Sequence, residues 1–210
     1  MNGRNILIGL RLGDRPRSLS HAGFTMIELL VVIAISAILF TFMYKGFERL
    51  TRYDTAENVK AGTQQSARIG VEMMVKDIRL AGLNPLGTAG AGVVAASPTS
   101  FRFTADVNLD GTVDVADPFE DITYGLNLDG TCGTCLQQTN QLGTETLLDN
   151  VNTLALTYLD DTGTAIPAAS LAARLLDIRT VGINLTLNRL AGREGTVSRT
   201  YTTQVRCRNL

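Results

Sequence analysis

The sequence of 210 residues is poor in histidine, with a single one, His21, in the polar segment before a long apolar run. The chain after residue 21 therefore has no imidazole, which excludes histidine-dependent nucleophilic catalysis and histidine-ligated zinc there. Aromatic residues make up only 6% of the sequence, and no basic patch runs through it. Because nucleic-acid-binding surfaces combine clustered basic residues with aromatics, no nucleic-acid partner is expected. The sequence predicts a protein that is not an enzyme.

Charge is almost absent between Phe24 and Tyr44, where Glu28 is the only charged residue. As an α-helix these 21 residues have a length of about 31 Å, enough to span a bilayer. A carboxylate in such a helix costs roughly 2.5–3.5 kcal/mol, so Glu28 is expected to have a partner or a function. The leader before the apolar run carries four arginines, Arg4, Arg11, Arg15 and Arg17.

An ordinary secretory signal does not account for this segment. Such signals have an apolar core of about 7–15 residues followed by a cleavage site of small residues, whereas this run is longer and has no Ala-x-Ala end. A plain signal anchor would explain the arginines of the leader through the positive-inside rule. It leaves Gly23 and Glu28 without an explanation.

Gly23 is followed by Phe-Thr-Met-Ile-Glu28 and then by the rest of the apolar run. This arrangement resembles the prepilin processing site of type IV pilins and type II secretion pseudopilins. The resemblance implies that a prepilin peptidase cuts between Gly23 and Phe24 and methylates the new N-terminal amine. It also implies that Glu28 pairs with the methylated amine of a neighbouring subunit. Two alternatives are a neutral, tolerated Glu28 and a role in peptidase recognition alone.

Four segments are predicted: a cleaved leader (1–23), an apolar membrane or filament helix (24–45), an amphipathic helix half (46–82) and a β-rich globular head (83–210). Removing 23 residues from 210 leaves 187, enough for one modest globular domain after the apolar part. The chain has 19 Lys and Arg against 20 Asp and Glu, of which the leader holds four and one. The mature chain therefore has 15 against 19, a net charge of −4.

The predicted fold class is α+β, with a long N-terminal helix packed on an antiparallel sheet, as in pilins. Apolar spacings of three and four predict one helix from about Thr25 to about Leu80, ended by Gly82 and Asn84-Pro85. Residues 87–97 are predicted to be a loop and 168–176 a short helix. Strands are predicted at 100–105, 121–126, 146–148, 154–159, 178–187 and 196–206, the last two forming a hairpin joined by 188–195.

The end of the predicted helix, Asp77-Ile-Arg-Leu-Ala-Gly, and the C-terminal residues 199–209 resemble PilW-type minor pilins and J-type minor pseudopilins. The resemblance implies a structural minor pilin at the initiating tip of a type IV pilus. Its partners would be the peptidase, other minor pilins, the major pilin and a tip adhesin. It would cross the inner membrane once, with a periplasmic head, before moving to the pilus and cell surface. Alternatives are a type II minor pseudopilin, a signal-anchored module that never polymerises, and a surface-binding domain displayed on the filament.

The segment 106–117 carries the spacing of a calcium loop. Such loops place oxygen ligands at positions 1, 3, 5, 7, 9 and 12, with Gly at position 6. Gly111 is at position 6, the final acid is Asp as in dockerin loops, and Pro118 leaves no exit helix. A structural Ca²⁺ is predicted, the alternative being a solvated, metal-free acidic loop. The predicted ligands are Asp106, Asn108, Asp110, Thr112 through its carbonyl, Asp114 and Asp117.

Three cysteines are present, and Cys132 and Cys135 have redox spacing. A thioredoxin-type site needs this pair at a helix N-terminus after a strand, but here it follows Gly130 and precedes the polar residues 137–141. In an oxidising periplasm a structural Cys132–Cys135 disulfide is the preferred prediction, leaving Cys207 free. A link from Cys207 to one of the pair is the alternative.

Overall fold

The computed structural model describes residues 23–114, 116–130, 132–192 and 195–210. Residues 1–22 of the predicted leader lie outside the described residues, as do residues 193–194 of the predicted final connection. The chain divides into two compact units, residues 1–47 and 48–210.

The helix α1 runs from Met26 to Ile78 and contains 53 residues. The long helix predicted from residues 25 to 80 is therefore confirmed. Beyond Ile78 the chain turns, and Gly82 adopts a positive φ of 79°. Its N–H donates to the Thr104 carbonyl at 3.0 Å, and a Cβ on Gly82 would lie 2.8 Å from the Asn209 carbonyl oxygen. Glycine at this turn lets the end of α1, a strand and the C-terminal residues approach closely.

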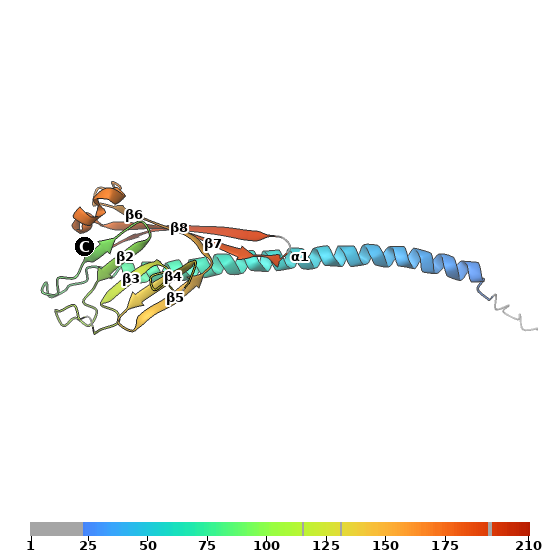
Figure 1. Cartoon of the computed structure of the whole chain (residues 1–210), viewed down its shortest axis with the longest axis horizontal. Coiled ribbons are helices and arrows are strands. Elements are labelled where there is room, and N and C mark those ends of the chain that lie inside the picture. The colour runs from blue at the N-terminus through green and yellow to red at the C-terminus, as the bar shows by residue number, and fades with distance from the viewer. Residues whose placement is uncertain (1–22, 115, 131, 193–194) are drawn as a thin grey trace, which may run out of the picture. The chain divides into compact units, whose positions relative to one another are not determined.

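The head contains two antiparallel sheets, a difference from the single sheet predicted (Figure 1). One has five strands in the order β1-β2-β3-β4-β5, and the other has three in the order β6-β7-β8. Two short 3₁₀ helices, η1 (Ala168–Ala173) and η2 (Leu175–Asp177), lie where a short helix is predicted. The strands are β1 (Val93–Ala96), β2 (Ser100–Thr104), β3 (Asp121–Leu126), β4 (Cys135–Asn140), β5 (Gly143–Asp149), β6 (Val151–Leu159), β7 (Thr180–Leu190) and β8 (Thr196–Arg206).

All six predicted strands are present, and two further strands were missed. β1 lies in the Gly- and Ala-rich segment predicted to be a loop, and it pairs with β2 at the edge of the five-stranded sheet. β4 begins at Cys135 and has a polar sequence, yet its first four residues are buried. Tertiary packing, which local pattern does not reveal, stabilises both strands.

One apolar core joins the second unit's part of α1 to both sheets. The helix contributes a stripe at spacings of four, three and four, formed by Ala67, Val71, Met74 and Ile78, which are all almost fully buried. The five-stranded sheet contributes Phe101 and Tyr124 among others, and the three-stranded sheet contributes several leucines and valines. The helix stripe therefore organises the head, because both sheets bury apolar side chains in the cluster that it forms.

A buried tyrosine links the two sheets. Tyr158 of β6 donates its hydroxyl to the Ser97 carbonyl at 2.7 Å and to the Ser100 carbonyl at 3.1 Å. The backbone N–H of Leu156 donates to the Pro98 carbonyl at 2.7 Å. These bonds satisfy polar groups of the β1–β2 turn and cover part of the edge of β6.

A second buried tyrosine ties the five-stranded sheet to the end of α1. Tyr124 of β3 is fully buried and donates to Asp77 Oδ2 at 2.5 Å. Burial, and next the hydrogen bond to Asp77, raise the pKa of Tyr124 far above its ordinary value. The phenol therefore stays protonated and donates throughout the physiological pH range.

Replacing Tyr124 by Phe is expected to lower the free energy of unfolding by about 1–3 kcal/mol, since Asp77 loses its hydrogen-bond donor. Thermal unfolding of the mature chain in detergent measures the change. Tyr53→Phe is the matched control, because Tyr53 is 65% exposed and should leave the melting temperature unchanged. Equal melting temperatures for the Tyr124 variant and the native chain would contradict a stabilising role for this bond.

Candidate functional site

The start of α1 is capped by its own sequence. Thr25 precedes the helix, and its Oγ1 accepts the backbone N–H of Glu28 at 3.3 Å. Thr and Glu three residues apart form the pattern of a capping box. The Glu28 carboxylate lies in the first turn, where the positive end of the helix dipole favours an anion. This cap was not predicted from the sequence, although the Thr-x-x-Glu pattern indicates it.

The predicted cleavage site is open in the described structure. Phe24 is 84% exposed, and no atom lies within 4 Å of a Cβ placed on Gly23. The helix begins only at Met26. The peptide bond between Gly23 and Phe24 therefore lies outside the helix, where a protease reaches the backbone without unwinding α1.

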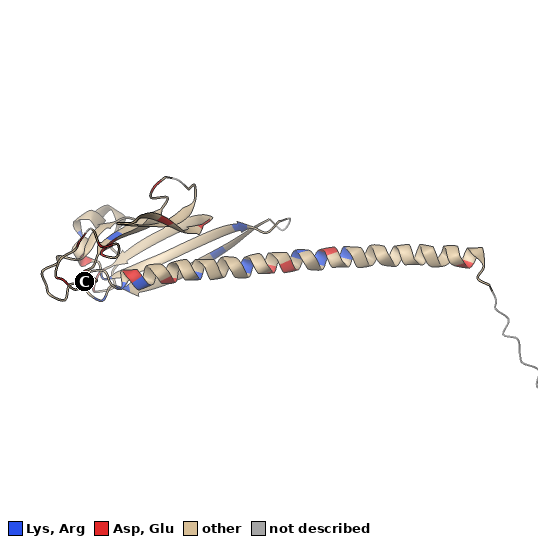
Figure 2. Cartoon of the chain, turned by 90° about the horizontal axis from the view of Figure 1, so that it is seen from below, with Lys and Arg blue, Asp and Glu red and all other residues tan. Residues whose placement is uncertain are grey.

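The first unit presents an apolar surface along its helix. Every large apolar side chain from Phe24 to Tyr44 is more than half exposed. Figure 2 shows that α1 carries no charge over this stretch after its first turn. By length and composition α1 is long and apolar enough to cross a membrane, and its most apolar window is not buried by any described residue. Such a surface is unfavourable in water and requires lipid or neighbouring apolar chains.

The acidic loop 106–120 connects β2 to β3 beside the end of α1. Asp106 is fully buried and accepts the backbone N–H groups of Asp110 at 3.1 Å and Gly111 at 3.0 Å. Its own N–H donates to the Leu83 carbonyl at 2.8 Å. Gly111 has a φ of 87°, and a Cβ there would lie 2.6 Å from Thr88 Oγ1. The loop is thus held firmly to the segment that follows α1.

The other carboxylates of this loop are turned toward nearby backbone. Asp114 accepts the N–H of Ala116 at 2.7 Å, and Asp117 accepts the N–H of Phe119 at 3.0 Å. Asp110 accepts both the hydroxyl and the N–H of Thr112, and the hydroxyl bond lowers its pKa. Each acid therefore stabilises a local turn.

Glu120, which sequence reasoning missed, closes the loop. Its carboxylate is fully buried and accepts the N–H groups of Val107 at 3.1 Å, Asn108 at 3.3 Å and Asp114 at 2.7 Å. Glu120 lies three residues after Asp117, the predicted final ligand, and is therefore not one of the positions that the calcium-loop spacing defines. No sequence signal marked it, because its partners are backbone groups.

The predicted calcium ligands come from one loop, but the structure does not gather them. Among residues 23–114, 116–130, 132–192 and 195–210, no three His, Cys, Asp or Glu side chains are grouped so that they could hold a metal ion. Asn108 and Asp110 do contact each other, with Nδ2 to Oδ2 at 3.2 Å. Calcium binding is therefore a proposal that depends on the ligand spacing of the sequence.

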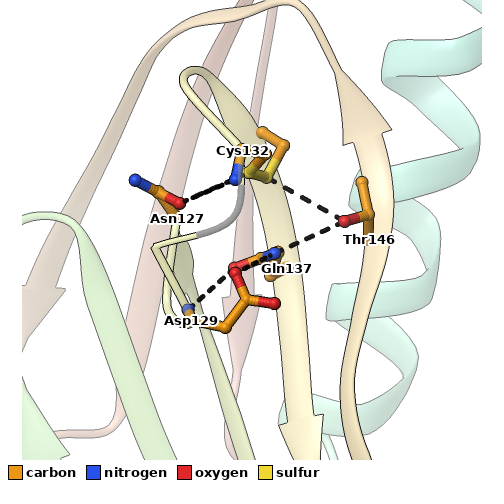
Figure 3. The surroundings of a disulfide bond; sticks show 6 residues. Asn127, Asp129, Cys132, Gln137 and Thr146 are labelled. Carbon is orange, nitrogen blue, oxygen red and sulfur yellow. Dashed lines mark hydrogen bonds between the residues drawn. A yellow bond between two sulfur atoms is a disulfide. The ribbon is translucent and has the colours of Figure 1, made fainter.

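Cys132 and Cys135 form a disulfide, with their Cα atoms 5.9 Å apart. The bond lies at the end of the connection from β3 to β4, where β4 begins, and Figure 3 shows the polar network around it. Cys132 N–H donates to Asn127 Oδ1 at 3.2 Å, and the buried Gln137 donates to Asp129 Oδ1 at 2.7 Å. No helix begins at this pair, so the setting differs from that of a thioredoxin-type site.

Cys207 is a free, buried thiol just after β8. Burial raises its pKa to about 11. The alternative of a disulfide from Cys207 to Cys132 or Cys135 is wrong, since those two are bonded to each other.

Comparison with known proteins places one motif in this chain. Residues 19–44 match the family model of the prokaryotic N-terminal methylation motif. The matched region contains Gly23, Phe24 and Glu28 and the start of α1. Together with the apolar helix, it supports a type IV pilin-like chain that a prepilin peptidase processes and that a single helix anchors in the membrane before assembly. A comparison with curated proteins gave no match.

Proposed function

We propose that this chain is a minor pilin, a structural subunit of the complex that initiates a type IV pilus and stays at its tip. A prepilin peptidase cuts between Gly23 and Phe24 and methylates Phe24. The mature chain then leaves the membrane and joins the filament through its apolar helix. Its expected partners are the other minor pilins, the major pilin and a tip adhesin.

The observation that carries this proposal is the exposed apolar half of α1 with its single acid in the capped first turn. In a helix surrounded only by lipid, the charged Glu28 side chain would raise the free energy of insertion by roughly 2.5–3.5 kcal/mol with no compensating interaction. In a bundle of helices that share this N-terminal motif, a new N-terminal amine on a neighbouring subunit is an ion-pair partner for Glu28. The pair offsets a cost that each ion would otherwise carry alone.

The size of the head favours a minor over a major subunit. The segment after α1 runs from residue 79 to residue 210 and contains two sheets and the long acidic loop. A head of this size does not suit close, repeated packing along a filament. The periplasm is its proposed location before assembly, and the cell surface after it.

A type II secretion minor pseudopilin of the J type is the alternative, because the same two patches, residues 77–82 and 199–209, resemble it. The genes beside this one distinguish the two, since pilins with a large adhesin support the pilus and secretion subunits support the pseudopilus.

Mass spectrometry of membrane and sheared-filament fractions tests the proposal. The expected result is an N-terminal methyl-Phe24 in both fractions. A Met1 start in membranes, with none of the chain in filaments, would refute it.

We also propose that the loop 106–117 takes up Ca²⁺ as a structural ion. Its support is the ligand spacing and the density of acids, since Asp110 and Asp114 are exposed and near each other in sequence. Calcium sites of extracellular modules have dissociation constants of about 10⁻⁴–10⁻³ M.

Calcium at one hundred times the dissociation constant is expected to stabilise the mature chain by about 2.7 kcal/mol, a rise of about 5–10 °C in melting temperature. A chelator should remove the gain. Asp110→Asn with Asp114→Asn should abolish it, whereas Asp161→Asn, outside the loop, should keep it. The same melting temperature in calcium and in chelator would exclude a structural ion.

A further inference from the structure

The strand β8 forms an open edge of the three-stranded sheet. It pairs with β7 over all eleven residues from Thr196 to Arg206, with no register shift. In the described part of the chain β8 has no other strand neighbour. Natural edge strands are commonly protected by proline, lysine, bulges or short length. β8 has no proline, lysine or bulge and is eleven residues long, and its only charged residues are Arg199 and Arg206.

The free hydrogen-bonding groups of this edge belong to the even-numbered residues. Cys207 N–H bonds to the Arg179 carbonyl at one end of the ladder, and Ala191 N–H bonds to the Gly195 carbonyl at the other. In an antiparallel pair, bonded and non-bonded positions alternate. Odd residues of β8 therefore bond to β7, while the N–H and C=O groups of Thr200, Thr202 and Gln204 point away from the sheet.

A groove lies between β8 and α1. It has a volume of about 570 Å³ and is lined by Tyr201 and Thr203 of β8 and by Val75 and Leu80 among other residues of the helix region. It shares Leu83 and Asn209 with a second hollow of about 480 Å³ at the end of the helix. The groove thus offers apolar contacts beside a row of free backbone groups, the arrangement that a fourth strand needs.

The charged side chains around this groove are mainly basic, which favours an acidic occupant. Lys76, Arg79 and Arg208 line it, and none of them has an ion-pair partner among the described residues. The only acid in the lining, Glu72, is bonded to Arg68 at 2.7 Å. β8 itself carries Arg199 and Arg206 and no acid. Two copies joined through this edge would therefore bring like charges together, which is unfavourable.

We infer that the outer edge of β8 binds an extended, acidic segment of a different protein, which adds as a fourth strand to the sheet β6-β7-β8. The segment's backbone bonds to Thr200, Thr202 and Gln204, its apolar side chains enter the groove, and its carboxylates pair with Lys76, Arg79 and Arg208. This is strand addition to an exposed edge, in which main-chain bonds give affinity and side chains give specificity. The inference goes beyond filament assembly, because it concerns the head alone.

Photo-cross-linking locates the partner. A benzophenone amino acid is placed at Thr202 of the full chain in the cells that make it, and cross-linked peptides are identified by mass spectrometry. The matched control places it at Ala155, which lies across the sheet in line with Asn184 and Thr202 but on the opposite edge strand. The expected result is cross-linking from Thr202 alone, to a segment that contains Asp or Glu and alternates apolar with polar residues.

A synthetic peptide of the captured segment then tests the mode of binding to the mature chain in detergent. Thr202→Pro removes one outward N–H without breaking the β7 ladder, and it should weaken binding about tenfold. Thr202→Val keeps that N–H and should bind as the native chain does. Arg208→Glu should also weaken binding, while Arg208→Lys should preserve it. Circular dichroism checks that each variant is folded.

Several results would overturn the inference. These are equal cross-linking from Ala155, no cross-link from Thr202, capture of a second copy of this chain, or capture of a helical or basic segment. Equal binding by the proline and valine variants would also do so. Processing at Gly23 is measured on the same samples, so that failure of the proposed assembly is distinguished from failure of this interaction.

Discussion

Replacing Gly23 by Val leaves the leader attached, and the chain accumulates in the membrane with its N-terminus at Met1. In the proposed processing the cut lies immediately after Gly23, so a branched side chain there enters the peptidase at the residue before the scissile bond. The folded chain can accommodate a side chain at this position, since no atom lies within 4 Å of a Cβ placed on Gly23. The loss of processing would therefore report on the peptidase and not on misfolding. Intact mass measurement of membrane fractions gives the result.

Gly46→Ala is the matched control for this experiment. A Cβ at Gly46 also meets nothing within 4 Å, and Ala favours a helix over Gly by up to about 1 kcal/mol. This variant should be cut and methylated normally. Efficient removal of the leader from the Gly23 variant would contradict the proposed cleavage site, and loss of processing in both variants would indicate a general defect.

Replacing Glu28 by Gln should leave processing intact while reducing incorporation into filaments about one hundredfold or more. Gln keeps the shape of the side chain and its place in the first helical turn. It cannot balance the charge of an amine from a neighbouring chain, and an unpaired buried charge costs about 3–5 kcal/mol. Quantitative immunoblotting of sheared filaments against membranes measures incorporation.

Glu48→Gln provides the comparison, because Glu48 forms a partly exposed ion pair with Arg52 within α1. Surface pairs of this kind contribute about 0–1 kcal/mol, so incorporation should hardly change. Normal incorporation of the Glu28 variant would leave peptidase recognition, or mere tolerance, as the explanation of this acid.

The sequence was sufficient to predict those helices and strands whose local residue pattern indicates them. The helix followed from apolar spacing, and β3 and β8 were predicted with the bounds that the structure has. β4 was missed because Gln137 is polar and yet fully buried. Its side chain is satisfied by Asp129 and Thr146, partners that become neighbours only after folding. The division into two sheets was missed for the same reason, since strand order depends on contacts distant in sequence.

For the candidate site, the N-terminal motif was readable because Gly23, Phe24 and Glu28 are consecutive or nearly so. The acidic loop was readable as a pattern, but its internal arrangement was not. Glu120 takes the central position by accepting three backbone N–H groups. Residue spacing indicates which side chains could coordinate a cation. Backbone N–H donors are present at every non-proline position, so the sequence does not show which of them a carboxylate will bind.

The burial of Cys207 affects how stable the pairing of the three cysteines is against disulfide exchange. Exchange between thiols and disulfides proceeds through the thiolate. A thiol with a pKa of about 11 and almost no exposed surface supplies very little of it. Once the last strand has docked, the 132–135 bond is insulated from attack by the third cysteine. Attack by Cys207 on the 132–135 bond is therefore confined to the interval before the C-terminal residues reach their place.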